Sequence, residues 1–274
     1  MTEIYIPDGA EESEGLRRTT HLAVSAHQDD TEIMAYPGIL DCYGKPDNYF
    51  SAIVTADGAG SPRRGDYASM SDGEMAAVRI TEQKRAADVG KYSSLVLLGR
   101  PSCEIRNPSL SGITDEYVRL LLVMRPRVVY THALTDRHDT HVAVALRLIA
   151  ALRRLPADKR PSVLYGCEVW RDLDWLTGKE RVAFDVSARP GLARALLTVY
   201  DSQIAGGKRY DTAALGRRAA HATFSESHAC DGASALSLAM DMTPLMSGGD
   251  PAEYASAAVM RFAGDVCDRI RRLS

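Results

Sequence analysis

The chain has 274 residues and a formal net charge of −3, and 45% of its residues are hydrophobic. This size and composition are typical of a globular protein that buries a large core. The 33 basic residues are scattered or paired and are nearly balanced by 36 acidic ones. The charge pattern therefore indicates no partnership with nucleic acid and no binding to an anionic membrane.

The sequence also predicts a cytoplasmic protein. No apolar run reaches the roughly 20 residues of a membrane-spanning helix. The first segment, MTEIYIPDGAEESEG, lacks the apolar region of a secretory signal. The five cysteines are widely spaced, which argues against a disulfide framework or a cysteine zinc site. Association into a homo-oligomer is left open.

Short apolar runs alternate along the chain with longer stretches of helical period, a pattern typical of repeated βα units. Strands are expected at 21–26, 49–56, 94–98, 127–131, 162–166 and 182–186. Helices are expected at 31–43, 73–89, 114–124, 140–155, 191–203, 209–222 and 251–273. These elements predict an α/β fold, a Rossmann-like three-layer sandwich with a mostly parallel sheet and helices on both faces. Ligands of such folds bind beyond the carboxyl ends of the strands.

The first polar cluster, His27-Gln28-Asp29-Asp30, directly follows the strand expected at 21–26. In a turn that enters a helix, the spacing of three lets His27 and Asp30 converge on one point, which suits Zn²⁺. Alternatively, the two aspartates cap the helix that follows.

The second polar cluster contains three histidines within ten residues, His132, His138 and His141, after the strand expected at 127–131. His138 and His141 are three apart at the start of a helix and can share one face. Two histidines and one aspartate would give three ligands and one open coordination position, the pattern of a catalytic zinc.

Four segments together resemble one known family. The run AHQDDTE resembles the AHPDDxE signature of the PIG-L/LmbE-like family of zinc-dependent N-acetylglucosaminyl deacetylases, and RHDTHVA resembles its HPDHxA signature. IVTADGAGS is similar to the family's T-x-G segment, and VRITEQKRAADVGKYSSLVLLG to its R-x-x-E-x-x-x-A helix and following strand. The four segments occur in the family's order over about residues 20–150.

The resemblance implies an LmbE-like deacetylase fold that forms a single domain over residues 1–274, in which 160–274 complete the sheet and the substrate pocket. It implies a metal held by His27, Asp30 and His141. It also implies that Asp29 is the general base and that His138 supports the oxyanion or acts as the acid. The implied cofactor is Zn²⁺, although Fe²⁺ or Co²⁺ would satisfy the same ligands.

The resemblance also places Arg79, the arginine of the R-x-x-E helix, at the substrate. Two departures from the family signatures stand out. Gln28 replaces a proline, which removes no ligand. HDTH replaces HPDH, so Asp136, Asp139 or no residue at all takes the place of the aspartate that orients the first histidine.

The segment 165–175 contains both tryptophans beside charged residues, as sugar pockets do. Trp170, Arg171 and Asp172 are therefore predicted to bind the substrate; alternatively, the tryptophans fill the core. Asp57, in the glycine-rich loop DGAG, either binds sugar hydroxyls or forms part of a plain turn. His221 and His228 either line the pocket or serve packing and surface roles.

The predicted function is a zinc-dependent hydrolase that removes the N-acetyl group from a small amino-sugar compound. The expected partner is an N-acetylglucosamine derivative or glycoside, for example an intermediate of an antibiotic or another secondary metabolite. The alternative is a non-catalytic sugar- or metal-binding protein that retains the fold. Retention of Asp29 argues against that alternative, because a protein that only binds zinc needs no carboxylate beside the ligands.

Overall fold

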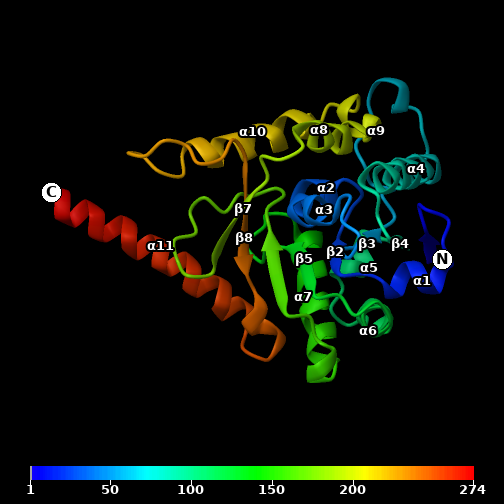
Figure 1. Ribbon diagram of the computed structural model, residues 1–274, viewed down its shortest axis with the longest axis horizontal. Helices are drawn as coiled ribbons and strands as arrows, with labels where there is room; N and C mark the ends of the chain where they lie inside the picture. The colour runs from blue at the N-terminus through cyan, green and yellow to red at the C-terminus, as the bar shows by residue number, and fades with distance from the viewer. Residues whose placement is uncertain (1) are drawn as a thin grey trace.

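The computed structural model describes residues 2–274 and places the strands in one eight-stranded sheet (Figure 1). The strand order is β1-β4-β3-β2-β5-β6-β8-β7. The five strands from β4 to β6 in this order are parallel, whereas β1, β8 and β7 add to the edges by antiparallel pairing. The strand bounds are β1 (Glu3–Tyr5), β2 (His21–Ser25), β3 (Phe50–Ala56), β4 (Ser94–Arg100), β5 (Val128–His132), β6 (Val163–Cys167), β7 (Arg181–Asp185) and β8 (Leu236–Asp241).

Helices cover both faces of the sheet, so the predicted three-layer α/β architecture is confirmed (Figure 1). One face carries α2 (Asp30–Met34), α3 (Tyr36–Cys42), α4 (Asp72–Gly90), α8 (Pro190–Thr198), α9 (Asp201–Ile204) and α10 (Tyr210–Thr223). The other face carries α1 (Glu12–Arg17), α5 (Ser102–Arg106), α6 (Gly112–Met124) and α7 (Asp139–Arg154). Short 3₁₀ turns lie at η1 (Gly65–Tyr67), η2 (Ala157–Lys159) and η3 (Thr243–Met246).

Alternating side chains of the central strands build two separate cores. Leu22 and Val24 of β2 pack with the α6 and α7 side of the sheet, whereas Ala23 between them packs with the α2 and α3 side. Because successive strand residues point to opposite faces, each central strand needs apolar residues throughout. This explains why the short continuous apolar runs in the sequence predict these strands well.

The helix expected at 31–43 is instead two helices, α2 and α3. Pro37 lacks the N–H that would bond to the Ile33 carbonyl in a continuous helix. The Arg218 side chain supplies a donor in its place, 3.0 Å from the Ile33 oxygen. The helix expected at 191–203 is likewise divided into α8 and α9, and Tyr200 lies between them, fully buried.

The strands β1 and β8 were not expected from the sequence. β1 has only three residues, too few to show a period. β8 reads LSLAMD, and leucine, alanine and methionine favour helix in isolation. Its strand conformation follows from pairing with β6 and β7 on both sides, which is tertiary context.

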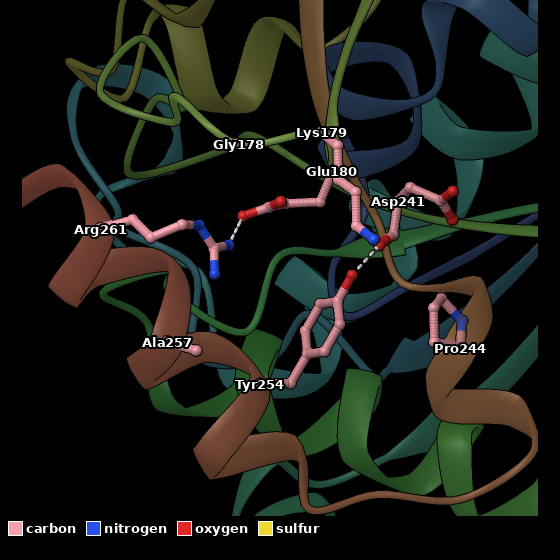
Figure 2. A pocket seen from close by; sticks show the side chains of 8 residues that line it. All are labelled: Gly178, Lys179, Glu180, Asp241, Pro244, Tyr254, Ala257 and Arg261. Atoms are coloured by element: carbon pink, nitrogen blue, oxygen red, sulfur yellow. Dashed lines mark hydrogen bonds and ion pairs between the residues drawn. The ribbon is translucent and has the colours of Figure 1, made fainter.

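The last helix, α11 (Pro251–Leu273), extends away from the body of the molecule (Figure 1). Its first turns contact the edge of the sheet next to β7 and β8, and together they line a crevice of 620 Å³ (Figure 2). There the Tyr254 hydroxyl donates to the Asp241 carbonyl, and Arg261 pairs with Glu180. Neither α11 nor any other helix within residues 2–274 has both the length and the apolar character that crossing a bilayer requires.

Arg147 of α7 fixes α5 and the loop after it. Its guanidinium donates to the carbonyls of Ile105 at 2.8 Å and Leu110 at 2.6 Å, and also to those of Glu104 and Asn107. Arg147 is only 7% exposed. One buried cation therefore satisfies four carbonyls of an irregular segment and holds it against α7.

We expect Arg147→Met to lower the free energy of unfolding by about 3 kcal/mol, because buried carbonyls lose their donor. Chemical denaturation measures this change. Arg154→Met on the same helix is the matched control, since the exposed Arg154–Asp115 pair contributes little. Equal effects of the two substitutions would contradict the anchoring role of Arg147.

Candidate active site

The two polar clusters meet at the carboxyl ends of β2 and β5, which pair side by side as parallel strands. His27 and Asp30 follow β2, and Asp30 is the first residue of α2. His138 is the N-cap of α7, and His141 lies in the first turn of that helix. The parallel pairing thus brings together side chains that are 114 positions apart in the sequence.

Three donor atoms from this group form a nearly equilateral triangle. His27 Nδ1 lies 3.2 Å from His141 Nε2, and Asp30 Oδ2 lies 3.3 Å from each of these nitrogens. Ligands at about 2.0–2.1 Å from a tetrahedral zinc are separated by roughly 3.3 Å. The donor set and its spacing therefore fit a divalent cation with one further position open.

His132 also lies at the site but has a different role. Its ring stacks on that of His141 with 3.9 Å between centroids. Its Nε2 accepts a hydrogen bond of 2.8 Å from the Ala26 backbone N–H. Because that lone pair is already engaged, His132 fits a supporting position beneath the donor triangle better than a ligand position.

Asp136 lies behind His141. Its Oδ1 is 3.4 Å from His141 Nδ1 and accepts a 2.9 Å hydrogen bond from the His138 backbone N–H. Its Oδ2 accepts from the Trp170 backbone N–H at 3.0 Å. Asp136 therefore contacts His141 at Nδ1, whereas the Nε2 of the same ring faces Asp30, and it fixes the loop. Asp139 is exposed at the start of α7.

The His138 imidazole is oriented by its own helix. Its Nδ1 accepts a 3.3 Å hydrogen bond from the Thr140 backbone N–H. The proton of the neutral ring therefore resides on Nε2, which makes that nitrogen a donor. Burial, followed by the charges of His141 and His27, lowers the pKa of His138. A neutral ring that donates from Nε2 is therefore the favoured form.

Asp29 is held in an unusual backbone conformation, with φ at +85°. Such left-handed values are costly for residues other than glycine and concentrate at functional sites. The Asp29 N–H donates to Gln83 at 3.3 Å, and its carboxylate accepts from Arg79 at 3.0 Å. Burial raises the pKa of Asp29 to about 6, against the opposing charge of Arg79.

Arg79 lies under Asp29 and is only 1% exposed. Besides Asp29, its guanidinium donates to the Gln28 carbonyl and to Glu82, the latter at 3.1 Å. Glu82 in turn accepts from the backbone and hydroxyl of Ser202, at 2.6 and 2.7 Å. The R-x-x-E pair thus links Asp29 to the segment around α9. Arg79, which the family resemblance places at the substrate, also lines the cavity beside Asp29.

Glu32, which sequence reasoning did not single out, is fully buried next to this network. It accepts hydrogen bonds from the hydroxyls of Tyr92 and Tyr200, both at 2.6 Å, and from Gln83 at 2.9 Å. Burial raises the pKa of Glu32 to about 7. Glu32 is the last residue of the motif AHQDDTE, and this position was the signal in the sequence that could have pointed to it. Its three hydrogen-bonding partners are distant in the sequence, so the network itself could not be predicted.

A 520 Å³ cavity opens over the donor triangle. Asp57, Trp170 and Arg79, which the sequence analysis places at the substrate, line it, and so do Asp29, Asp30 and His138. Arg171 and Asp172 are not among the lining residues. Lining residues that the sequence analysis missed include Ser61, Ser102, Arg106, Gln203, Lys208 and Tyr210.

The remaining aromatic and histidine candidates lie away from this cavity. Trp175 packs against the core and against Phe262 of α11. His221 is buried with its Nδ1 3.6 Å from Glu168, and His228 is exposed. The packing alternative therefore describes Trp175 and His221 better than a pocket role.

Sequence and structure comparisons agree with the resemblance noted above. Residues 22–152 match the family described as PIG-L: GlcNAc-PI de-N-acetylase. The chain therefore contains a PIG-L family domain, and the family predicted from the four motifs is confirmed. No curated protein matches the sequence.

Solved structures similar to this chain share its LmbE-like deacetylase fold. N,N′-diacetylchitobiose deacetylase from Pyrococcus horikoshii aligns with a TM-score of 0.66 and 15% identity, covering 85% of this chain and 87% of that one. A zinc-inhibited form of teicoplanin deacetylase aligns with a TM-score of 0.56 and 14% identity, covering 81% and 97%. The 4-carboxy-2-hydroxymuconate hydratase of Pseudomonas putida KT2440 aligns with a TM-score of 0.58 and 16% identity, covering 82% and 96%. The same fold thus occurs in deacetylases and in a hydratase.

The raised pKa of Asp29 predicts a specific pH dependence of stability in the metal-free protein. A buried acid whose pKa is about 6 when folded and near its ordinary value when unfolded favours the folded state at low pH. That contribution is lost as the pH rises towards and through 6. Metal-free Asp29→Asn should therefore gain about 2–3 kcal/mol relative to wild type between pH 4 and 7. The free energies of unfolding of wild type and Asp29→Asn are measured by denaturant titration in the presence of a chelator. If the two vary with pH in parallel, the pKa of Asp29 is not raised.

Proposed function

We propose that this protein is a zinc-dependent hydrolase that removes the N-acetyl group from a small amino-sugar compound. The observation that carries the proposal is the donor triangle of His27, Asp30 and His141, with the separate carboxylate of Asp29 beside it. His27 and Asp30 of this triangle, together with Asp29, line a cavity of 520 Å³, which is within the size range of small-molecule sites. Fe²⁺ or Co²⁺ would fit the same ligands. The proposal includes a single cytoplasmic domain over residues 1–274.

In the proposed mechanism, His27, Asp30 and His141 would hold a divalent cation, which would supply polarisation of the acetyl carbonyl and a lower pKa of the attacking water. Asp29 does not belong to the triangle and is held by Arg79 and Gln83, so its ionised carboxylate can accept the proton of that water. His138 Nε2 donates a hydrogen bond to the oxyanion of the tetrahedral intermediate. Asp29 then returns its proton to the nitrogen of the leaving amine, which releases acetate and the free amino sugar.

The arrangement around Asp29 favours this hydrolase over a protein that only binds a sugar or a metal. A buried carboxylate with a strained backbone is costly to maintain. Arg79 and Gln83 form hydrogen bonds directly with Asp29. Glu82 and Ser202 are linked to Asp29 through Arg79. A site that only coordinates a cation gains nothing from this arrangement, whereas a general base depends on it.

Asp29→Asn should lower kcat for acetate release by about 10²–10⁴-fold, the usual contribution of a general base, while zinc remains bound at one equivalent per chain. The assay is acetate release from a panel of N-acetyl amino sugars, free and glycosidically linked, with zinc content measured in parallel. Glu11→Gln is the control, because Glu11 is exposed near the N-terminus. Near-normal turnover of Asp29→Asn on a substrate of the wild-type protein would contradict the base assignment.

Asp136→Asn should weaken zinc binding by about 10–100-fold, because the carboxylate behind a metal-ligating histidine orients the ring and raises its basicity. Competition with a chromogenic chelator measures the affinity. Asp139→Asn is a matched control, since Asp139 lies three residues away and is exposed. If both variants bound zinc like wild type, Asp136 would have no role in the metal site.

A further inference from the structure

The left-handed backbone of Asp29 depends on side chains of α4. A residue other than glycine keeps such a conformation only where its surroundings hold it, and the Asp29 side chain forms no capping hydrogen bond within its own turn. Its N–H donates to Gln83 Oε1 at 3.3 Å, and its carboxylate accepts from Arg79 at 3.0 Å. Gln83 and Arg79 are therefore the two side chains that hold Asp29 directly.

Tyr200 contacts both of these side chains from the segment between α8 and α9. Its hydroxyl group donates to Gln83 Oε1 at 3.0 Å, and Arg79 Cζ lies 5.4 Å from the centre of its ring. The same hydroxyl group donates to Glu32 at 2.6 Å, and the residue is only 1% exposed. Tyr200 is thus a buried support that Gln83 and Arg79 share.

The chemistry of the neighbouring groups fixes which end of the Gln83 amide faces Asp29. The Asp29 N–H can only donate, so the Gln83 atom beside it has to be the oxygen. The Gln83 nitrogen then donates to the Glu32 carboxylate at 2.9 Å. A reversed amide would place its NH₂ group against the Asp29 N–H and its oxygen against the carboxylate, and neither contact would be a hydrogen bond. The Tyr200 hydroxyl group adds a donor on the oxygen side and so favours the orientation that Asp29 needs.

Tyr92 offers a comparison within the same chain. Its hydroxyl group donates to the other oxygen of Glu32, also at 2.6 Å, and the residue is 2% exposed. Its ring packs edge-on against Phe50 in the core, with 4.7 Å between centroids. Within residues 2–274, however, Tyr92 forms no hydrogen bond with Gln83. Tyr92 therefore matches Tyr200 in burial and in its bond to Glu32, but not in its link to Asp29.

We propose that Tyr200 is a positioning residue for the general base Asp29 and that it acts through Gln83 and Arg79. The inference rests on the proposed deacetylase function. It adds a residue from outside 22–152, the extent of the family match. Proton transfer depends on the position of the base, so the hydroxyl group of Tyr200 contributes to turnover although it touches neither the substrate nor the metal donors.

The first test compares Tyr200→Phe with the matched control Tyr92→Phe in the zinc-loaded full chain. Each substitution removes one hydroxyl group from Glu32 and keeps the ring, and denaturant titration should show similar losses of stability. Tyr200→Phe should lower kcat about 10–100-fold, because a small misplacement of a catalytic group is costly, while KM and zinc affinity change little. Tyr92→Phe should leave kcat close to the wild-type value. The substrate is the N-acetyl amino sugar that the wild type hydrolyses fastest.

The second test asks whether the hydroxyl group acts through Gln83. Gln83→Met keeps a side chain of similar length but offers no oxygen to the Asp29 N–H, so kcat should fall as it does in Tyr200→Phe. In a Gln83→Met background, Tyr200→Phe should have little further effect, because the two substitutions remove the same support. Additive losses of kcat would overturn the route through Gln83.

A third measurement does not require turnover. Amide hydrogen exchange of Asp29, followed by NMR on the isotope-labelled chain, reports how firmly its N–H is held. We expect exchange to be about tenfold faster or more in Tyr200→Phe and in Gln83→Met, because the acceptor is loosened or lost. Exchange in Tyr92→Phe should match that of the wild type.

The outcomes separate the two proposals. Acetate release that Tyr200→Phe leaves unchanged, or that both phenylalanine variants lower equally, would overturn the positioning role and leave the deacetylase standing. Faster exchange of the Asp29 amide in Tyr200→Phe but not in Tyr92→Phe, without acetate release from any substrate by the wild type, would support the hold of Tyr200 on Asp29 and overturn the deacetylase. Exchange that Tyr200→Phe leaves unchanged would overturn the positioning role at any level of turnover.

Discussion

The site depends on one electrostatic constraint, the burial of the Asp30 carboxylate among imidazoles. Asp30 is only 2% exposed, and an ionised carboxylate in such a place needs a compensating positive charge. Burial by itself would raise the pKa of Asp30, but His141 and His27 beside it hold that pKa well below its usual range. The arrangement therefore demands either protonated imidazoles or a cation between the three donor atoms. A divalent cation meets this demand and leaves the imidazoles neutral.

The rest of the structure holds the loop after β2 and the loop after β5 at a fixed distance from each other. Parallel pairing of β2 and β5 fixes the distance between the two loops, and Asp136 joins the His138 loop to the segment at Trp170. On the other side, Arg79 and Glu82 connect Asp29 to Ser202. The segments beyond the PIG-L family match thus contribute to holding the base and to forming the cavity wall. A substitution that disturbs the cavity wall would therefore affect Asp29 or His138 through these contacts and not through the sheet.

The sequence predicted the central strands and the two polar clusters well, because both are marked by residues that lie next to each other in the chain. The apolar runs of the central strands are buried on both faces and so appear continuous, and the clustered histidines and aspartates stand directly after two of them. Reasoning from the sequence failed where a distant partner decides the outcome. The strand β8 is specified by β6 and β7, and two of the groups that Arg79 bonds to, Asp29 and the Gln28 carbonyl, lie about 50 positions earlier in the sequence. Lys208 was missed as a cavity residue because its position depends on contact with Trp170, 38 positions earlier.

The most direct test is a crystal structure of the zinc-loaded protein with anomalous data collected at the zinc edge. The account predicts one strong peak per chain, bound by His27 Nδ1, Asp30 Oδ2 and His141 Nε2, with Asp29 and His138 close by but not coordinated. A peak coordinated by His132 in place of His27, or the absence of zinc from this site under saturating conditions, would contradict it.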